Sequence, residues 1–349
     1  MVGENFLSTI KKTLLTTLVM DGFWDRWKAH GVIPEDLEKI RYKFTSLENW
    51  GIGWKGLAIE KFEEAKSLVK QGRFKEAEYQ YRLSSLYYNL NQWIYPSRHA
   101  EKLTGYNELL QSTKEADELS DKKTVYDAFE VDGQYCEGRI RIPDNPKGII
   151  IIINPIDSSK EELFTYELDF IENGFITISF DGPGQGQTYT LNGLKATYKR
   201  WSTFIDKQIE YADTNYRDLP INLFGTSSGA AWAIYGSTNA LVNKVVAVSP
   251  ALTLKMETVL LPDYFIKRMN AVLEEGEQIL PHYEQLTYKK PILFFHGNLD
   301  VMVPDNEIYD YYHSIPVEKK LIEYADEGHC CNYKLQDVRK QAIRWFQNR

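Results

Sequence analysis

Three features are scarce in this chain of 349 residues, and each scarcity excludes a class of protein. The cysteines are Cys136, Cys330 and Cys331, which are too few and too poorly spaced for a disulfide framework or a zinc site. No window approaches the ~20 apolar residues that a membrane span requires. Basic residues number 41 against 49 acidic ones, and a formal net charge of −8 disfavours binding to a phosphate backbone. We therefore expect a cytoplasmic protein that binds neither nucleic acid nor membrane.

The rest of the composition is that of an ordinary globular protein, with 43% hydrophobic and 26% charged residues. A chain of this length allows one to three compact units. The apolar run at 14–20 follows two lysines, as in a signal peptide, but Asp21 and a charged, aromatic-rich stretch stand where a cleavage site would be needed. We interpret this run as part of a helix.

The hydrophobic pattern changes near residue 120. Before it, residues 54–70 and 74–91 carry apolar side chains at three- and four-residue spacings, separated by Gln71 and Gly72, which predicts an antiparallel helix pair. No second copy of the pair follows at a fixed period, so a helical repeat array is excluded. We predict an all-helical cap domain over 1–120 and a catalytic domain over 121–349.

Strand-like and helix-like segments alternate from residue 122 onward. A hairpin is expected at 125–131 and 136–142, turned by Asp132 and Gly133. Further strands are expected at 148–153, 175–180, 221–224, 244–248, 292–296 and 320–324, with helices that include 160–172 and 338–348. This alternation predicts an α/β fold with a doubly wound, mostly parallel sheet, whose ligands bind beyond the carboxyl ends of the strands.

Residues 225–229, Gly-Thr-Ser-Ser-Gly, match the pattern G-x-S-x-G between a buried strand and the helix-like run 230–235. A nucleophile on a sharp, strained turn needs small neighbours, because larger side chains would collide with the adjacent strand and helix. A bare match also fits a plain turn that packs a helix on a strand. The strand before it and the helix after it favour Ser227 as the nucleophile.

An acid and a histidine follow later strands in the order Ser, Asp, His, which is that of the α/β-hydrolase fold and not of chymotrypsin or subtilisin. Asp300 follows the strand at 292–296, where a carboxylate can orient an imidazole. Asp305 better fits the cap of a helix that begins at Asn306. His329 follows the last strand and is the predicted general base. The other histidines are expected to be packing or surface residues: His30, His99, His282, His296 and His313.

Two backbone N–H groups are expected to stabilise the oxyanion of the tetrahedral intermediate. One belongs to Ser228, the residue after the nucleophile. The other lies in 154–158, where Pro155 has no N–H, which leaves Ile156 as the choice and Asp157 as the reserve. The run 181–186, Asp-Gly-Pro-Gly-Gln-Gly, lacks the third glycine of a dinucleotide fingerprint, so we expect a structural loop and neither a cofactor nor a metal.

Together these segments resemble the FrsA-like esterase and hydrolase family, which includes dihydroxypseudooxynicotine hydrolase and polyketide-shortening hydrolases. The resemblance rests on Ser-Ser-Lys-Glu-Glu at 158–162, on 180–186, 225–229, 297–300 and 328–329, and on Ala65, Gly72, Ala77 and Tyr81 in the helical part. Two departures from the family pattern are Asn154-Pro155, in place of glycine-containing text, and Gln187-Thr188, in place of Glu-Ser. The resemblance implies that the N-terminal helices cover the active site and that substrate lies between the two parts.

Residues for the substrate are harder to choose. Tyr81, Tyr88 and Trp93 offer an aromatic wall, although aromatics at helical spacing are more often core. A candidate lid insertion at 256–287 contains Glu257, whose plainer interpretation is a solvated carboxylate.

For the activity, we expect hydrolysis of an acyl bond through an acyl-enzyme. We favour a C–C bond in an aromatic β-dicarbonyl or polyketide-like compound over an ester or thioester. Peptidase activity is a further alternative. A non-catalytic binding protein with a hydrolase fold is the alternative from another class, and it would be expected to lose a triad member. The expected partner is a small aromatic or hydrophobic molecule, and a homodimer is the candidate assembly.

Overall fold

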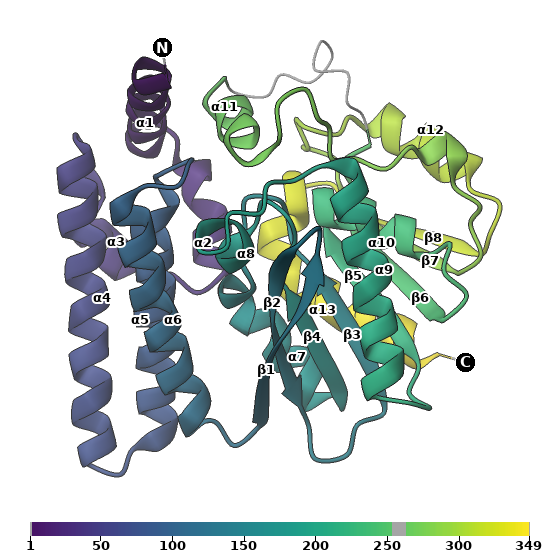
Figure 1. Ribbon diagram of the computed structural model, residues 1–349, viewed down its shortest axis with the longest axis horizontal. Coiled ribbons are helices and arrows are strands. Elements are labelled where there is room, and N and C mark those ends of the chain that lie inside the picture. The colour runs from purple at the N-terminus through teal and green to yellow at the C-terminus, as the bar shows by residue number, and fades with distance from the viewer. Residues whose placement is uncertain (1, 253–262, 349) are drawn as a thin grey trace. The chain divides into compact units, whose positions relative to one another are not determined.

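The structure, a computed structural model, describes residues 2–252 and 263–348 (Figure 1). It divides into two compact units. The helical unit comprises Met1–Lys123, Glu161–Thr165 and Pro262–Val272, and the α/β unit comprises Thr124–Lys160, Tyr166–Leu261 and Leu273–Arg349. Two short segments of the predicted catalytic domain therefore group with the N-terminal helices.

The helical unit is built on three long helices that lie side by side, with α5 between α4 and α6 (Figure 1). The helix α4 begins after Ser46, whose side chain accepts a hydrogen bond from the N–H of Asn49 at 3.1 Å. It ends at Lys70, and two residues later Gly72 turns the chain with a φ of +73°, which suits glycine. The predicted helix pair is confirmed, and α6 is a third member. The helices are α1 Val2–Val19, α2 Asp25–Ala29, α3 Pro34–Ile40, α4 Leu47–Lys70, α5 Phe74–Trp93, α6 Ala100–Leu119 and α11 Asp263–Val272.

Aromatic side chains form much of the core of this unit. Trp24, Phe44, Trp50 and Trp54 are fully buried and lie ring against ring, with 4.7 Å between the centroids of Phe44 and Trp50. The indole N–H groups of Trp24 and Trp50 donate to the carbonyls of Thr17 and Leu90, so their polar atoms are satisfied as well. Burial of each such ring stabilises the fold by roughly 1.5–3 kcal/mol.

The α/β unit contains an eight-stranded sheet in the order β1-β2-β4-β3-β5-β6-β7-β8. From β4 to β8 neighbouring strands are parallel, and β2 pairs with β4 antiparallel. The strands are β1 Lys123–Val131, β2 Gln134–Ile142, β3 Gly148–Ile153, β4 Phe175–Phe180, β5 Ile221–Thr226, β6 Val242–Val248, β7 Ile292–Gly297 and β8 Lys319–Tyr324. The predicted hairpin and mostly parallel sheet are confirmed.

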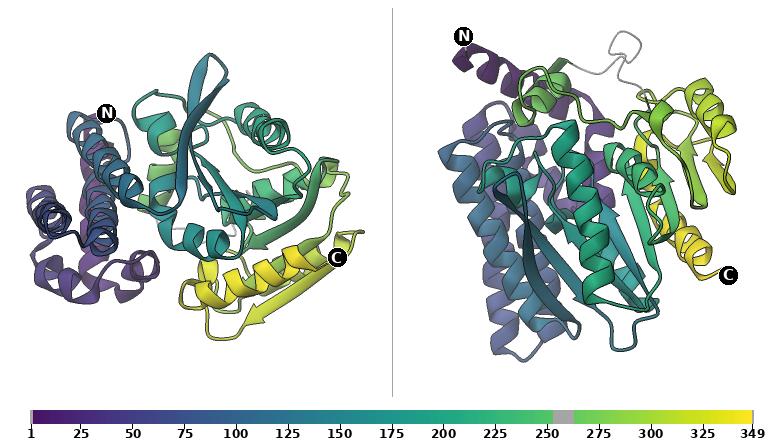
Figure 2. Two further views of the ribbon diagram at one scale, coloured as in Figure 1. Left: turned by 90° about the horizontal axis from the view of Figure 1, so that it is seen from below. Right: turned by 45° about the vertical axis from the view of Figure 1, so that its right-hand side comes forward.

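Helices cover both faces of this sheet (Figure 2). One face carries α9 Tyr198–Asn215 and α10 Ser228–Gly236, and the other carries α7 Phe164–Glu172 and α13 Leu335–Gln347. The central strands β3, β4, β5 and β7 are buried along their whole length, which explains why their sequences are nearly continuous runs of apolar residues. The remaining helices are the short α8 Gly186–Thr190 and α12 Asp305–Ser314. Over the described residues, no helix is both long enough and apolar enough to cross a bilayer.

Two local predictions were wrong. The segment 160–172 is not one helix, because Lys160–Leu163 forms a 3-10 turn ahead of α7. Asp305 is the first residue of α12 and does not cap it; the cap is Pro304. The Asp305 carboxylate instead accepts a hydrogen bond from Nε2 of the fully buried His296 at 2.7 Å. A buried imidazole N–H left without a partner costs more than an exposed helix N–H that water can satisfy.

Candidate active site

Ser227 stands on a strained turn at the carboxyl end of β5. Its φ is +55° and its ψ is −121°, between the last residue of the strand and the first residue of α10. A side chain at Gly225 would place Cβ 2.3 Å from the carbonyl oxygen of Gly229, and one at Gly229 would place Cβ 2.1 Å from that of Ile153. Both contacts are with backbone, so the two glycines of G-x-S-x-G are required by the close approach of β3, β5 and α10.

His329 lies between the other two residues of the predicted triad and contacts both. Its Nδ1 lies 2.7 Å from Oδ2 of Asp300, and its Nε2 lies 2.8 Å from Oγ of Ser227. The other carboxylate oxygen of Asp300 accepts hydrogen bonds from the N–H groups of Met302 at 2.8 Å and Val303 at 3.0 Å. Asp300 is therefore fixed on both sides, and a hydrogen-bonded chain runs from a buried carboxylate to a serine hydroxyl.

The charges of this chain shift both pKa values. Burial acts to lower the pKa of His329, but Cys330 and the Asp300 carboxylate, both hydrogen-bonded to its imidazole, outweigh burial and raise that pKa well above its ordinary value. Burial acts to raise the pKa of Asp300, but His329 and the two N–H donors outweigh it and lower that pKa. The pair therefore favours a carboxylate beside an imidazolium.

The loop that carries His329 is held by contacts that sequence reasoning missed. Cys330 and Cys331 both have positive φ values, +69° and +51°, which are uncommon for residues with a side chain. The N–H of Cys330 donates to Oγ of the fully buried Ser249 at 3.0 Å. At Gly297, a side chain would place Cβ 2.4 Å from the carbonyl oxygen of Glu327, so the end of β7 passes directly against this loop. The isolated Cys-Cys pair was the one visible signal of an unusual turn.

The predicted oxyanion donors also lie together. The N–H of Ile156 donates to the hydroxyl of Ser228 at 2.9 Å, so in this arrangement it already has an acceptor. The Asn154 side chain is buried, and neither of its amide atoms has a hydrogen-bond partner in the part of the chain that the structure describes. Gln185 holds this segment from the other side, since its amide donates to the carbonyls of Asn154 at 2.9 Å and Pro155 at 2.6 Å.

The glycine-rich loop 181–186 is organised by a buried charge. The Asp181 carboxylate accepts hydrogen bonds from the N–H of Lys160 at 2.8 Å, the ammonium of Lys160 at 2.9 Å and the N–H of Gln187 at 2.8 Å. A side chain at Gly186 would place Cβ 2.2 Å from this carboxylate. The two segments that carry the family resemblance, 158–162 and 180–186, thus meet at one ion pair. The sequence motifs indicate both segments but not the contact between them.

The predicted substrate residues are scattered. Tyr81 packs against Phe62, with 5.0 Å between ring centroids, in a cluster with Ala65 and Ala116. Trp93 lies under the guanidinium of Arg268, 3.6 Å from the ring centroid.

Tyr88 lines a pocket within the helical unit. Glu257 lies outside the described residues, as does the first part of the candidate lid 256–287. That any of these four residues contacts substrate stays a prediction.

Known proteins share this fold. A family model described as serine aminopeptidase, S33, matches residues 144–275, a stretch that contains Ser227 and ends before Asp300. The crystal structure of the 2,6-dihydroxy-pseudo-oxynicotine hydrolase superposes with a TM-score of 0.75 at 21% identity, over 92% of this chain and 94% of that chain. The chain has the α/β-hydrolase fold. The fold class expected from the sequence is confirmed.

Two curated relatives, both named as hydrolases, match part of this chain. The 2,6-dihydropseudooxynicotine hydrolase of Paenarthrobacter nicotinovorans is 24% identical over 213 residues, which are 60% of this chain and 57% of that protein. The α/β-hydrolase ucsC of an Acremonium species is 23% identical over 246 residues, 62% of this chain and 47% of that protein. The match thus spans about half the length of these relatives. The resemblance to pseudooxynicotine hydrolase stated from sequence motifs is confirmed.

Proposed function

We propose that this α/β-hydrolase is a serine hydrolase in which Ser227 is the nucleophile, His329 the general base and Asp300 the orienting acid. The observation that carries the proposal is the chain of two hydrogen bonds, 2.8 Å and 2.7 Å, that joins their side chains. Nε2 of His329 takes the proton of Ser227 as Oγ attacks a carbonyl carbon. The tetrahedral intermediate expels its leaving group, which takes the proton from His329, and an acyl-enzyme remains. Water activated by the same imidazole then releases the acid.

The oxyanion is held by the N–H groups of Ser228 and Ile156 in this proposal. The bond from Ile156 N–H to the Ser228 hydroxyl supports it, because the bond brings the segment after β3 against the residue that follows the nucleophile. For Ile156 to reach the oxyanion, its N–H must exchange the Ser228 hydroxyl for the substrate oxygen. The rotation of one hydroxyl about χ1 suffices for this exchange.

For the bond that is broken, we propose a C–C bond next to a carbonyl in an aromatic β-dicarbonyl or polyketide-like compound. The family resemblance supports this choice, and so does the electrostatics of His329. Cleavage of a C–C bond expels an enolate, which must be protonated as it leaves. The raised pKa of His329 favours the imidazolium that forms when it takes the Ser227 proton, and this imidazolium is the acid that can protonate the departing enolate.

An active-site phosphonate tests the nucleophile. We expect a single labelled peptide, modified at Ser227, and no label in Ser227→Ala. The matched control is Ser228→Ala, which keeps the elbow and should be labelled at Ser227. Label on Ser228, or no label on folded wild-type protein, would contradict the assignment and leave a non-catalytic hydrolase fold as the interpretation.

A matched substrate pair tests the bond. One aromatic acyl group is presented as a β-diketone and as an ester, and the specificity constants are compared. Turnover of both compounds supports the C–C proposal, because the triad that cleaves the harder bond also cleaves the easier one. If the ester is turned over efficiently and the diketone is untouched, the enzyme is a carboxylesterase.

A further inference from the structure

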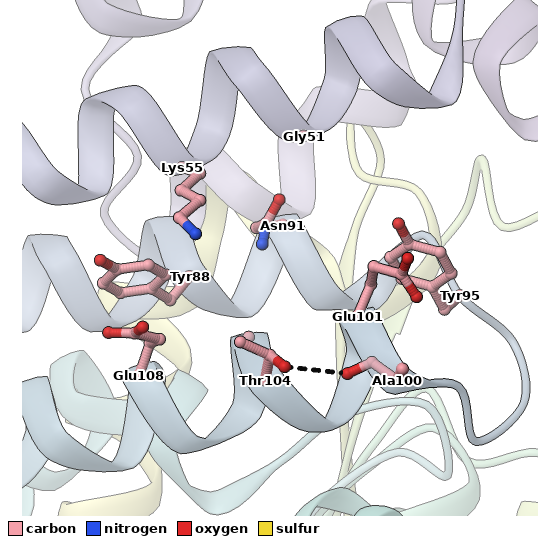
Figure 3. A pocket seen from close by; sticks show the side chains of 10 residues that line it. Gly51, Lys55, Tyr88, Asn91, Tyr95, Ala100, Glu101, Thr104 and Glu108 are labelled. Carbon is pink, nitrogen blue, oxygen red and sulfur yellow. Dashed lines mark hydrogen bonds between the residues drawn. The ribbon is translucent and has the colours of Figure 1, made fainter.

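The pocket that Tyr88 lines lies entirely within the helical unit, and no residue of the predicted triad lines it (Figure 3). It has a volume of about 340 Å³, within the range of small-molecule sites. Its floor is formed by Tyr88 and Asn91, which lie three residues apart on α5, and by Tyr95, which follows the end of that helix. The helix α4 forms one wall and α6 the other (Figure 3).

Two glycines keep this pocket open. Gly51 in α4 and Gly105 in α6 both face Asn91. A Cβ at Gly51 would lie 3.8 Å from Oδ1 of Asn91, and one at Gly105 would lie 3.2 Å from Nδ2 of Asn91 and 3.1 Å from Cβ of Gln92. Glycine inside a helix costs about 1 kcal/mol relative to alanine. Both walls therefore carry a residue that destabilises a helix at the position where a side chain would extend toward Asn91.

Opposite charges face each other across the pocket without pairing. Lys55 on α4 and Glu108 on α6 both reach toward Tyr88 (Figure 3). Neither makes an ion pair or a side-chain hydrogen bond with any residue that the structure describes, and the same holds for the Tyr88 hydroxyl and the Asn91 amide. Burial and Glu108 raise the pKa of Tyr88 to about 12, so its hydroxyl keeps its proton and can donate. A cation, a carboxylate, a phenol and an amide therefore converge on one space.

We propose that this pocket binds a small zwitterion with an aromatic body, in the chemical class of an aromatic α-amino acid. Its carboxylate pairs with Lys55, its ammonium pairs with Glu108, and the Asn91 amide donates to the one and accepts from the other. Its ring packs along the apolar faces of Tyr88 and Tyr95. The proposal is independent of the hydrolase chemistry.

Calorimetric titration of the full chain with L-phenylalanine tests the proposal. We expect a dissociation constant on the order of 0.1–1 mM. Two analogues separate the charges: 3-phenylpropionate lacks the ammonium, and phenethylamine lacks the carboxylate. Each should bind about tenfold more weakly than phenylalanine.

Variants assign the contacts. Lys55→Met should weaken binding of phenylalanine about tenfold and leave phenethylamine unchanged, and Glu108→Gln should weaken phenylalanine and leave 3-phenylpropionate unchanged. Gly51→Leu should fill the pocket and abolish binding. Its matched control is Gly56→Leu on the same helix. Gly56 does not line the pocket, and a Cβ there would have open space. Thermal melting shows that each variant is folded.

Absence of binding to folded wild-type protein at roughly 20 mM phenylalanine overturns the proposal. Binding that survives Gly51→Leu, or that is equal for phenylalanine and both analogues, also overturns it, because the ligand would then lie elsewhere or ignore the two charges. None of these outcomes bears on the proposed hydrolase function, because no residue of the predicted triad lines the pocket.

Discussion

At the scale of single residues, the imidazole of His329 decides how the site depends on pH. It must be neutral to accept the proton of Ser227, and its pKa is raised by Cys330 and Asp300. Below that pKa His329 is an imidazolium that cannot act as a base, and above it the base is available. The rate of acylation should therefore rise with pH, with a midpoint above the value of about 6.5 for an ordinary histidine.

Substitution of Cys330 should move the midpoint of the pH profile toward lower pH. Cys330→Ser keeps the size of the side chain and removes a group that raises the pKa of His329. The pH profile of kcat/KM for an ester substrate should shift toward lower pH in this variant, with the plateau rate nearly unchanged. A midpoint that stays where it is in Cys330→Ser would show that the sulfur does not influence the imidazole.

Asp300→Asn should leave the fold intact and lower turnover by about 10⁴-fold, because the amide favours the wrong imidazole tautomer. Stopped assays of kcat, with circular dichroism as the check on folding, measure this loss. Asp305 provides a matched control, since its carboxylate also contacts a histidine, His296, outside the triad. Asp305→Asn should change kcat less than tenfold. A loss below about tenfold in Asp300→Asn would point to another acid.

At the scale of elements, the nucleophile turn depends on the distance between β3 and α10. A methyl group at Gly229 would meet the carbonyl oxygen of Ile153 at 2.1 Å, so β3 or the start of α10, which follows Ser227, would have to move. Gly229→Ala should cost about 3 kcal/mol of stability and slow phosphonate labelling by more than tenfold. Urea denaturation and the labelling rate measure the two effects. Gly56→Ala is the control: its Cβ has open space in α4, so it should stabilise the protein slightly.

The loop after β3 makes a separate prediction. Ser228→Ala removes the hydroxyl that accepts the Ile156 N–H and retains both proposed oxyanion donors, which are backbone groups. We expect kcat within about threefold of wild type. A loss on the order of 100-fold would mean that the Ser228 hydroxyl itself stabilises the oxyanion, since removal of one such donor costs that much.

At the scale of the whole molecule, the two units are not separable by a cut near residue 120. The Glu162 carboxylate, which is 1% exposed, belongs to the helical unit and receives hydrogen bonds from Arg26 at 2.7 Å and Asn89 at 3.4 Å. Glu161 accepts a hydrogen bond from Tyr106 at 2.8 Å in the same unit. Removal of the N-terminal helices takes away every one of these partners.

A chain without residues 1–120 should therefore melt at a lower temperature, expose apolar surface and lose substrate selectivity more than it loses reactivity toward a phosphonate. Scanning calorimetry, the labelling rate and a substrate panel measure the three effects. A second truncation that also carries Glu162→Gln removes the unpaired charge and should recover part of the melting temperature. A truncated chain with wild-type stability and selectivity would show that the N-terminal helices are an appendage.

The sequence by itself determined the strands and the order of the triad residues. The central strands could be predicted because a strand that is buried on both faces has a continuous run of apolar residues. Ser227, Asp300 and His329 were proposed from the sequence because each lies within five residues of the end of a recognisable strand, and their catalytic roles stay a prediction. Such signals are local: they depend on neighbours within a few residues. Helix caps are also local signals but compete with tertiary contacts, and the cap predicted at Asp305 was wrong for that reason.

Only the tertiary structure decided which distant residues meet. The contact of Lys160 with Asp181, the support of Cys330 by Ser249, the grouping of Glu161–Thr165 with the helical unit and the pocket between Gly51 and Gly105 join segments that no periodicity connects. Side-chain packing selects these contacts, because close-packed interiors leave each buried charge and each glycine gap one compatible neighbour. A pattern of apolar residues records that a face is buried, and it does not record which face covers it.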